Sequence, residues 1–119
     1  RVVEDFPEVL DSMVVDLEYL GRESYMPLFV VLREGVTLDA TLEQRIRDKI
    51  RTELSARHIP NEVVAVAEIP RTLTGKKMEL PIKKLLLGMP LEKIANPDAM
   101  SNPGALAFYA AFATSPRRG

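Results

Sequence analysis

The longest periodic pattern in the chain lies between residues 38 and 54. Apolar side chains recur there every four residues, at Leu38, Leu42, Ile46, Ile50 and Leu54. This spacing places them in one stripe along an α-helix, with charged residues on the other face. Thr37 or Asp39 suits the N-cap position, because each carries a side-chain oxygen that can accept a backbone N–H. We therefore expect an amphipathic helix that buries its stripe against a neighbouring layer.

Two β-type segments flank this helix and predict that layer. Residues 26–33 (MPLFVVLR) form the most apolar run, and residues 62–69 (EVVAVAEI) alternate Val and Ala. Pro27 is expected near the start of its strand, where a missing N–H does least harm. Each segment is therefore predicted to be a strand.

The N-terminal part is predicted to supply the partner of the 26–33 strand. Residues 12–20 (SMVVDLEYL) have the pattern of a strand, and the Gly-Arg-Glu-Ser stretch at 21–24 supplies a turn. The two strands would form an antiparallel hairpin. A short helix is expected at 7–11, because proline is favoured in a first helical turn.

The C-terminal part is expected to add two helices, at 81–87 and at roughly 103–113, around an irregular segment rich in Pro, Gly and Asn. The aromatic residues Phe108, Tyr109 and Phe112 are predicted to pack in the core. At 119 residues and 46% hydrophobic, the chain fits one compact domain. The predicted fold class is α+β, a small and mostly antiparallel sheet of about three strands with about three packed helices.

Composition argues against several classes of function. The formal net charge is −1, so no bulk electrostatic attraction favours nucleic acid or a membrane surface. The chain has no cysteine, which fits a reducing compartment, and residues 1–20 lack the pattern of a signal peptide. A cytoplasmic protein is therefore predicted. The first residue is Arg1 and not Met, so we expect a fragment of a longer protein.

The segment IPRTLTGKK, residues 69–77, carries the strongest local signal for chemistry. Its Gly-Lys pair lacks the rest of a phosphate-binding loop, because Pro70 stands where the first glycine is needed and Lys77 where Ser or Thr is needed. The lone His58 has no His, Cys or carboxylate at ligand spacing, so a surface histidine is expected there and no metal site. The segment is thus either a simple hairpin tip or a device that holds an ammonium group beside an anion.

Basic residues gather around this segment, at Arg71, Lys76, Lys77, Lys83 and Lys84. A cluster of this kind is typical of a solvated face or an anion site. No aromatic residue is interleaved with the basic residues, so nucleic-acid stacking has little support. Residues 1–20 carry the opposite excess, with six acidic side chains and one Arg.

The segment also matches a longer signature. It carries, in order, Pro70, Arg71, Thr74, Gly75 and Lys76. This order resembles the C-terminal signature of the acyl-adenylate-forming ligases, the superfamily of acyl-CoA synthetases, peptide-synthetase adenylation domains and luciferases. The preceding hairpin, helix and strand occur in the same order in that superfamily. The resemblance implies the mobile C-terminal lid domain of such a ligase, with Lys76 as the lysine of the adenylation half-reaction.

The resemblance is narrower in the C-terminal half. Glu79 stands three residues after Lys76, where the wider superfamily has Arg, and the blocks ELPIKKLLLG, PLEKIANP and NPGALAFYAAFA follow. These features resemble the acetoacetate–CoA ligase branch from about residue 58 to 113. The branch implies acetoacetate and CoA as substrates, ATP as the nucleotide, and Mg²⁺ held by ligands outside this chain. A ligase for another short-chain acid is an alternative.

The resemblance assigns roles that physical chemistry supports. An ammonium at Lys76 would stabilise the charge that builds up as a carboxylate attacks the α-phosphate of ATP. Thr74 and Gly75 would position Lys76, because glycine permits a tight turn and threonine can stiffen it by local hydrogen bonds. Arg51 aligns with an arginine that lies near the CoA 3′-phosphate in acetyl-CoA synthetases, and a guanidinium suits a phosphate well. The alternative is that Arg51 is one of several charges on the solvated face of the 38–54 helix.

The same resemblance implies that residues 1–119 are one part of a two-domain enzyme. A large N-terminal adenylation domain and the hinge would precede Arg1, so the isolated chain is expected to be inactive. The rival hypothesis is a stand-alone binding or interaction module that keeps the lid fold and holds an anionic partner with its basic loop.

Overall fold

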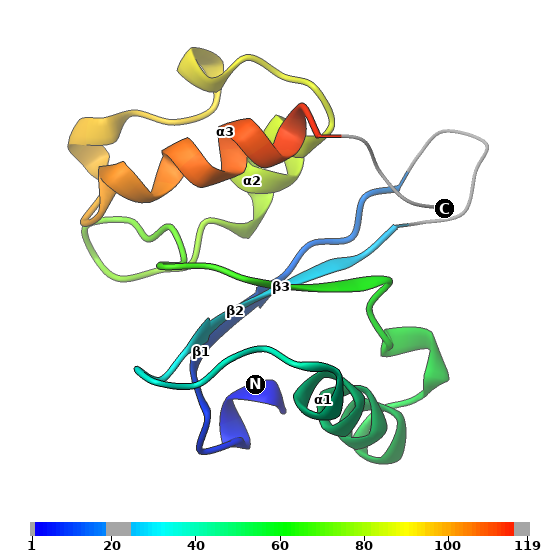
Figure 1. The fold of residues 1–119 in the computed structure, drawn as a ribbon. Coiled ribbons are helices and arrows are strands. Elements are labelled where there is room, and N and C mark those ends of the chain that lie inside the picture. Colours follow the sequence, from blue (N-terminus) through cyan, green and yellow to red (C-terminus); the bar gives the residue numbers. More distant parts are fainter. Residues whose placement is uncertain (1, 19–24, 116–119) are drawn as a thin grey trace.

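The centre of the molecule is a three-stranded sheet. The structure is a computed structural model and describes residues 2–18 and 25–115 (Figure 1). The strands stand in the order β1-β2-β3, at Val9–Val14, Pro27–Leu32 and Glu62–Ala65. Strands β1 and β2 pair antiparallel, as the predicted hairpin requires, and β3 pairs parallel with β2. The antiparallel ladder has five residue pairs and the parallel ladder four, and the α+β class is confirmed.

Helix α1 spans Ala40–Glu53, inside the range that the four-residue stripe predicted. Leu42, Ile46 and Ile50 are buried in the core that it shares with the sheet. The N-cap is Asp39, whose carboxylate accepts the Leu42 N–H at 2.8 Å. The sequence predicted either Thr37 or Asp39 as the N-cap, and in the structure it is Asp39.

The C-terminal half forms a second helical layer from α2, Glu79–Leu86, and α3, Leu106–Ala113. The irregular segment expected between them is present as a series of short turns. In the described residues, 3-10 turns occur at Val3–Asp5, Ala56–His58, Leu91–Lys93, Pro97–Ala99 and Pro103–Ala105. No helix in the described part of the chain is long and apolar enough to span a bilayer.

The sheet lies between these two helical layers. In β2, Leu28 and Val30 contact the core beneath α1, whereas Phe29 between them contacts the core beneath α2 and α3. Figure 1 shows α1 on one side of the sheet and α2 with α3 on the other. Because β2 is covered on both faces, its sequence is a continuous apolar run and not an alternating one.

Three local expectations need correction or qualification. The helix predicted at 7–11 is wrong, because strand β1 already begins at Val9, which is buried and pairs with Leu32 of β2. Pairing with a strand some 20 residues away outweighs the local preference of a proline for a helix start. The turn predicted at 21–24 lies outside the described residues. Core packing holds for Tyr109, whereas Phe108 is 40% exposed.

Candidate functional site: the Lys76 hairpin

Residues 69–77 fold into a tight hairpin on the α2–α3 side of the sheet. Arg71 and Lys77 form an antiparallel bridge, and the Met78 N–H donates to the Pro70 carbonyl at 3.0 Å. Pro70 and Met78, one on each arm, are buried. Both arms of the hairpin are therefore anchored in the core.

Thr72 closes the tip of the hairpin through four hydrogen bonds. Its carbonyl accepts the Gly75 N–H at 2.9 Å, and its own N–H donates to the Lys76 carbonyl at 2.9 Å. Its hydroxyl oxygen accepts the Lys76 N–H at 3.1 Å and lies 3.1 Å from the hydroxyl of Thr74. Gly75 has φ +89°, in the left-handed region that glycine adopts without a Cβ penalty. The backbone on both sides of Lys76 is thus fixed by the turn.

The side chain of Lys76 extends from this tip into solvent. The residue is exposed, and its ammonium has no hydrogen-bond or ion-pair partner among residues 2–18 and 25–115. Leu73 and Thr74 beside it are exposed as well. The tip can therefore bring an uncompensated positive charge to an anion on another surface.

Three of the five basic residues in the sequence cluster are neutralised by the acidic N-terminal segment. These ion pairs are Arg71–Asp11 at 2.5 Å, Lys77–Glu4 at 2.6 Å and Lys83–Glu18 at 3.2 Å. Within the described part of the chain, Lys76 and Lys84 are the members of the cluster without such a partner. The cluster is therefore not one free basic patch, and among the described residues the charge available to a ligand is left at Lys76, on the hairpin tip, and at Lys84, on α2.

Asp11 of strand β1 holds both arms of the hairpin. It accepts from Arg71 on one arm and lies 3.5 Å from the Lys77 ammonium on the other. Arg71 in turn donates from its second terminal nitrogen to the Gly75 carbonyl at 2.7 Å. A chain of contacts thus runs from the sheet through a guanidinium to the residue before Lys76.

Glu4 completes this network at the base of the hairpin. Its carboxylate accepts from the Lys77 ammonium at 2.6 Å and from the Ser12 hydroxyl at 2.7 Å. Partial burial acts to raise the pKa of Glu4, but the hydrogen bonds from Lys77 and Ser12 and the lysine charge outweigh it. The pKa therefore lies below its ordinary value of 4.5.

Glu4→Gln is expected to remove an acid-sensitive part of the stability. A carboxyl whose pKa is lower in the folded chain stabilises it above the unfolded pKa and loses that effect as the pH falls through the folded pKa. Because the side chains of Glu4 and Lys77 are about 30% exposed, we expect a loss of at most ~1 kcal/mol at neutral pH. Urea denaturation at pH ~7 and pH ~3 measures it.

The exposed Glu92, which has no partner among the described residues, supplies the matched control. Glu92→Gln should leave the free energy of unfolding unchanged at both pH values. A difference between wild type and Glu4→Gln that stays constant across this pH range would contradict the role assigned to the Glu4 carboxylate.

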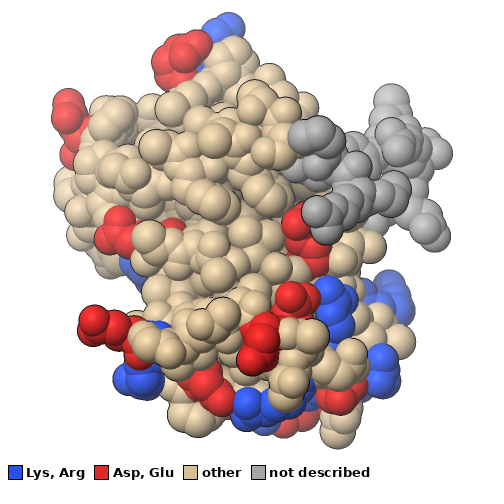
Figure 2. Space-filling view, in the orientation of Figure 1, with Lys and Arg blue, Asp and Glu red and all other residues tan. Residues whose placement is uncertain are grey.

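Arg51 lies on the last turn of α1, on the opposite side of the sheet from the hairpin. Its guanidinium contacts Asp48 at 3.3 Å, and both side chains are more than half exposed. Figure 2 shows positive and negative side chains interspersed over the α1 layer, in the lower part of the view. The structure therefore brings Thr74, Gly75 and Lys76 together but leaves Arg51 on a separate surface.

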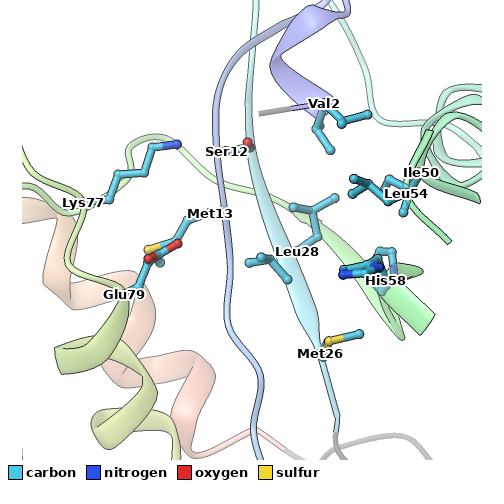
Figure 3. Close-up of a pocket in the computed structure, with 13 residues that line it drawn as sticks. Val2, Ser12, Met13, Met26, Leu28, Ile50, Leu54, His58, Lys77 and Glu79 are labelled. Atoms are coloured by element: carbon cyan, nitrogen blue, oxygen red, sulfur yellow. The ribbon is translucent and has the colours of Figure 1, made fainter. Parts of the chain in front are cut away.

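A pocket of about 170 Å³ opens between the base of the hairpin and the end of α1. Figure 3 shows Lys77 and Glu79 at one end of it and Leu54 and His58 at the other, with apolar side chains between. His58 is exposed, as expected, and its Nδ1 lies 2.8 Å from the Ser55 hydroxyl. Among the described residues, no group of three or more acidic or histidine side chains could hold a metal ion.

Glu79, which replaces the Arg of the wider superfamily signature, lies at the start of a helix. It is the first residue of α2, where a carboxylate interacts favourably with the positive end of the helix dipole. The side chain is exposed and lines the pocket beside Lys77.

The network around the hairpin was not predicted from the sequence. Asp11 and Arg71 are 60 positions apart, and Glu4 and Lys77 are 73 positions apart. The available signal was the acidic excess of residues 1–20 opposite the basic cluster after residue 70. Pairing these two observations would have placed the N-terminal segment beside the hairpin.

Known proteins are similar to this chain in both sequence and fold. Acetoacetyl-CoA synthetase of Macaca fascicularis is 40% identical over 109 residues, which cover 92% of this chain and 16% of that protein. Acetoacetyl-CoA synthetase from Streptomyces lividans matches 94% of this chain and 17% of its own, with a TM-score of 0.86 and 48% identity. Brucella canis acyl-CoA synthetase matches 72% of this chain and 15% of its own, with a TM-score of 0.58 and 27% identity.

The chain thus spans about one sixth of the length of these relatives. Residues 2–76, from the start of the described chain to the lysine of the hairpin, match the family model of the AMP-binding enzyme C-terminal domain. The matched segment contains β1, β2, α1, β3 and the hairpin tip. The chain belongs to the family of AMP-binding enzyme C-terminal domains.

Proposed function

We propose that this chain is the C-terminal domain of an ATP-dependent acetoacetate–CoA ligase. The full protein would convert acetoacetate, ATP and CoA to acetoacetyl-CoA, AMP and pyrophosphate through an acyl-adenylate. The similarity to acetoacetyl-CoA synthetases over nine-tenths of the chain supports this assignment. The observation that carries it is the hairpin that fixes the backbone of Lys76 and presents its ammonium, which has no partner in the described part of the chain.

Lys76 would act in the adenylation half-reaction. As the carboxylate attacks the α-phosphate of ATP, negative charge builds up on the α-phosphate oxygens and on the departing pyrophosphate, and a fixed ammonium stabilises that arrangement more than the separated ground state. The turn formed by Thr72, Thr74 and Gly75 holds the backbone of Lys76 before the substrate arrives, so little reorganisation is needed. The ion pair of Asp11 and Arg71, with the hydrogen bond from Arg71 to the Gly75 carbonyl, would hold the hairpin tip in a fixed orientation.

The remaining parts of the reaction would come from outside this chain. Mg²⁺, when bound, screens the negative charge of the pyrophosphate leaving group. The described residues include no cluster that could hold it. We assign its ligands, the adenine site and the acyl pocket to a large adenylation domain that precedes this one, and we expect no turnover by residues 1–119 alone.

Arg51 would contact the 3′-phosphate of CoA in the second half-reaction. Its guanidinium is exposed and its one described partner is an equally exposed carboxylate, so a phosphate can replace that partner at small cost. Arg51 and Lys76 lie on opposite sides of the sheet. A domain that uses both residues at one active site must therefore turn between the two half-reactions.

Arg51→Ala is expected to raise the KM for CoA roughly tenfold, the equivalent of one lost charge-assisted hydrogen bond. Acetoacetate-dependent ATP–pyrophosphate exchange should stay at the wild-type rate, because it precedes CoA binding. The matched control is Arg57→Ala, since Arg57 is exposed just beyond α1 and has no partner among the described residues. An unchanged KM for CoA in Arg51→Ala would remove Arg51 from the CoA site.

The proposed reaction is tested by ATP–pyrophosphate exchange with the full-length protein and a panel of short acids. We expect acetoacetate to support exchange far better than acetate, propionate or butyrate. Exchange with another acid of the panel in place of acetoacetate would keep the ligase chemistry but overturn the substrate. No exchange with any acid would favour the binding-module hypothesis.

A further inference from the structure

A segment near the C-terminus pairs with the hairpin that carries Lys76. Residues 99–101 run antiparallel beside its first arm. The Leu73 N–H donates to the Ala99 carbonyl at 3.0 Å, and the Ser101 N–H donates to the Arg71 carbonyl at 3.1 Å. Figure 1 shows this orange stretch, which leads into α3, beside the light-green hairpin. The hairpin is therefore the edge of a small three-stranded arrangement and not an isolated two-stranded turn.

Asn102 adds a side-chain clamp at the end of this pairing. Its side-chain oxygen accepts the Arg71 N–H at 2.9 Å, and its amide nitrogen donates to the Ile69 carbonyl at 2.9 Å. These two groups flank Pro70, which has no N–H and cannot extend a backbone ladder there. One amide side chain thus satisfies both polar groups around the proline at the start of the hairpin.

The clamp is tied to the core. Met100, two residues before Asn102, is 4% exposed, and Ala105 and Leu106 after it are also buried. Further along α3, Tyr109 is fully buried and donates to the Glu68 carbonyl at 3.0 Å, just before the hairpin. Met100, Asn102 and Tyr109 all lie beyond the segment that matches the family model, which ends at Lys76. The fold shared by the family therefore receives this support from an added C-terminal segment.

We propose that Asn102 is a positioning residue for adenylation, acting through the hairpin backbone on Lys76. The proposal rests on the proposed function of Lys76. A two-stranded hairpin is only marginally stable by itself, and a third strand with a side-chain clamp fixes its direction. Loss of the clamp leaves the Arg71 N–H and the Ile69 carbonyl without these partners, so the arm that leads to the tip can move. Displacement of a reacting group by about 1 Å can cost on the order of 100-fold in rate.

The test compares Asn102→Ala with Asn96→Ala in the full-length protein. Asn96 is an exposed asparagine of the same segment. Its side-chain oxygen accepts the Asp98 N–H at the start of the 97–99 turn, and none of its described hydrogen bonds reaches the hairpin. We expect Asn102→Ala to lower the kcat of acetoacetate-dependent exchange ~10- to 100-fold at an unchanged KM for acetoacetate. Thioester formation from supplied acetoacetyl-adenylate and CoA should be unchanged, and Asn96→Ala should match wild type in both assays.

Hydrogen–deuterium exchange gives a readout that does not depend on activity. Peptides that cover residues 71–77 should exchange faster in Asn102→Ala than in wild type, with the peptides of α1 unchanged. If the wild-type protein shows no acetoacetate-dependent ATP–pyrophosphate exchange, the proposed function fails. Unchanged deuterium uptake of residues 71–77 in Asn102→Ala would instead contradict the role of Asn102 in holding the hairpin, whatever the activity.

Asn102→Asp provides a second variant in case Asn102→Ala does not fold. It keeps an oxygen to accept the Arg71 N–H but places a carboxylate oxygen against the Ile69 carbonyl, so a loss of the same kind is expected. Equal losses in both half-reactions would show a general structural role and overturn the proposal. Unchanged adenylation in a folded variant would overturn it as well.

Discussion

Lys76→Ala in the full-length protein is expected to lower acetoacetate-dependent ATP–pyrophosphate exchange by at least ~100- to 1000-fold, the range measured when one preorganised transition-state donor is removed. The ammonium stands at the tip of a turn whose backbone is fixed by Thr72 and Gly75, and it has no other partner in the described residues. Its removal therefore deletes a charge without breaking a structural contact. The variant should fold as the wild type does.

Lys84→Ala is the matched control for this result. Lys84 is a second exposed lysine of the same basic cluster without a described partner, and it lies on α2, away from the hairpin tip. Its removal lowers the net charge equally and should leave exchange within a few-fold of wild type. Exchange that survives Lys76→Ala would identify the hairpin as a structural turn and bring the binding-module hypothesis forward.

Tyr109→Ala is expected to lower the free energy of unfolding by ~3–5 kcal/mol, the usual cost of truncating a buried aromatic side chain. The ring is fully buried and packs edge-on against Phe29, with centroids 4.9 Å apart. Its hydroxyl donates to the Glu68 carbonyl at 3.0 Å, and burial raises the pKa of this hydroxyl, with the Asp11 charge adding to the effect. The group therefore stays a neutral donor at any ordinary pH. Chemical denaturation of the 119-residue chain measures the change.

Two variants separate the contributions to this loss. Phe108→Ala removes a neighbouring ring on the same helix that is 40% exposed, and it should cost clearly less than Tyr109→Ala. Tyr109→Phe keeps the ring and removes the hydrogen bond, so a loss of about 1 kcal/mol is expected. Similar losses for Tyr109→Ala and Phe108→Ala would contradict the assignment of Tyr109 to the core that joins β2 to α3.

The elements that were predicted correctly have strong local patterns. The stripe of helix α1 and the apolar run of strand β2 can be read from a few consecutive residues, because each follows the period of its own structure. The helix predicted at 7–11 failed because the pairing of Val9 with Leu32 is a long-range contact that a local preference cannot reveal. The parallel placement of β3 also depends on the path of α1 across the sheet.

In the candidate site, too, the local features were predicted and the long-range contacts were not. Lys76 and its turn were found from the sequence, since the Thr-Gly-Lys motif is local. The residues that hold the turn, Asp11 and Asn102, come from opposite ends of the chain and meet it only in the folded structure. The roles of Lys76 and Arg51 and the predicted cytoplasmic location stay predictions.

The measurement to make first is the rate of each half-reaction in Lys76→Ala, with acetoacetyl-adenylate and CoA supplied for the second. Lys76 and Arg51 lie on opposite sides of the sheet, so we predict that adenylation is lost while thioester formation stays within a few-fold of wild type. Loss of both half-reactions to the same extent, or retention of both, would contradict the assignment of Lys76 to adenylation.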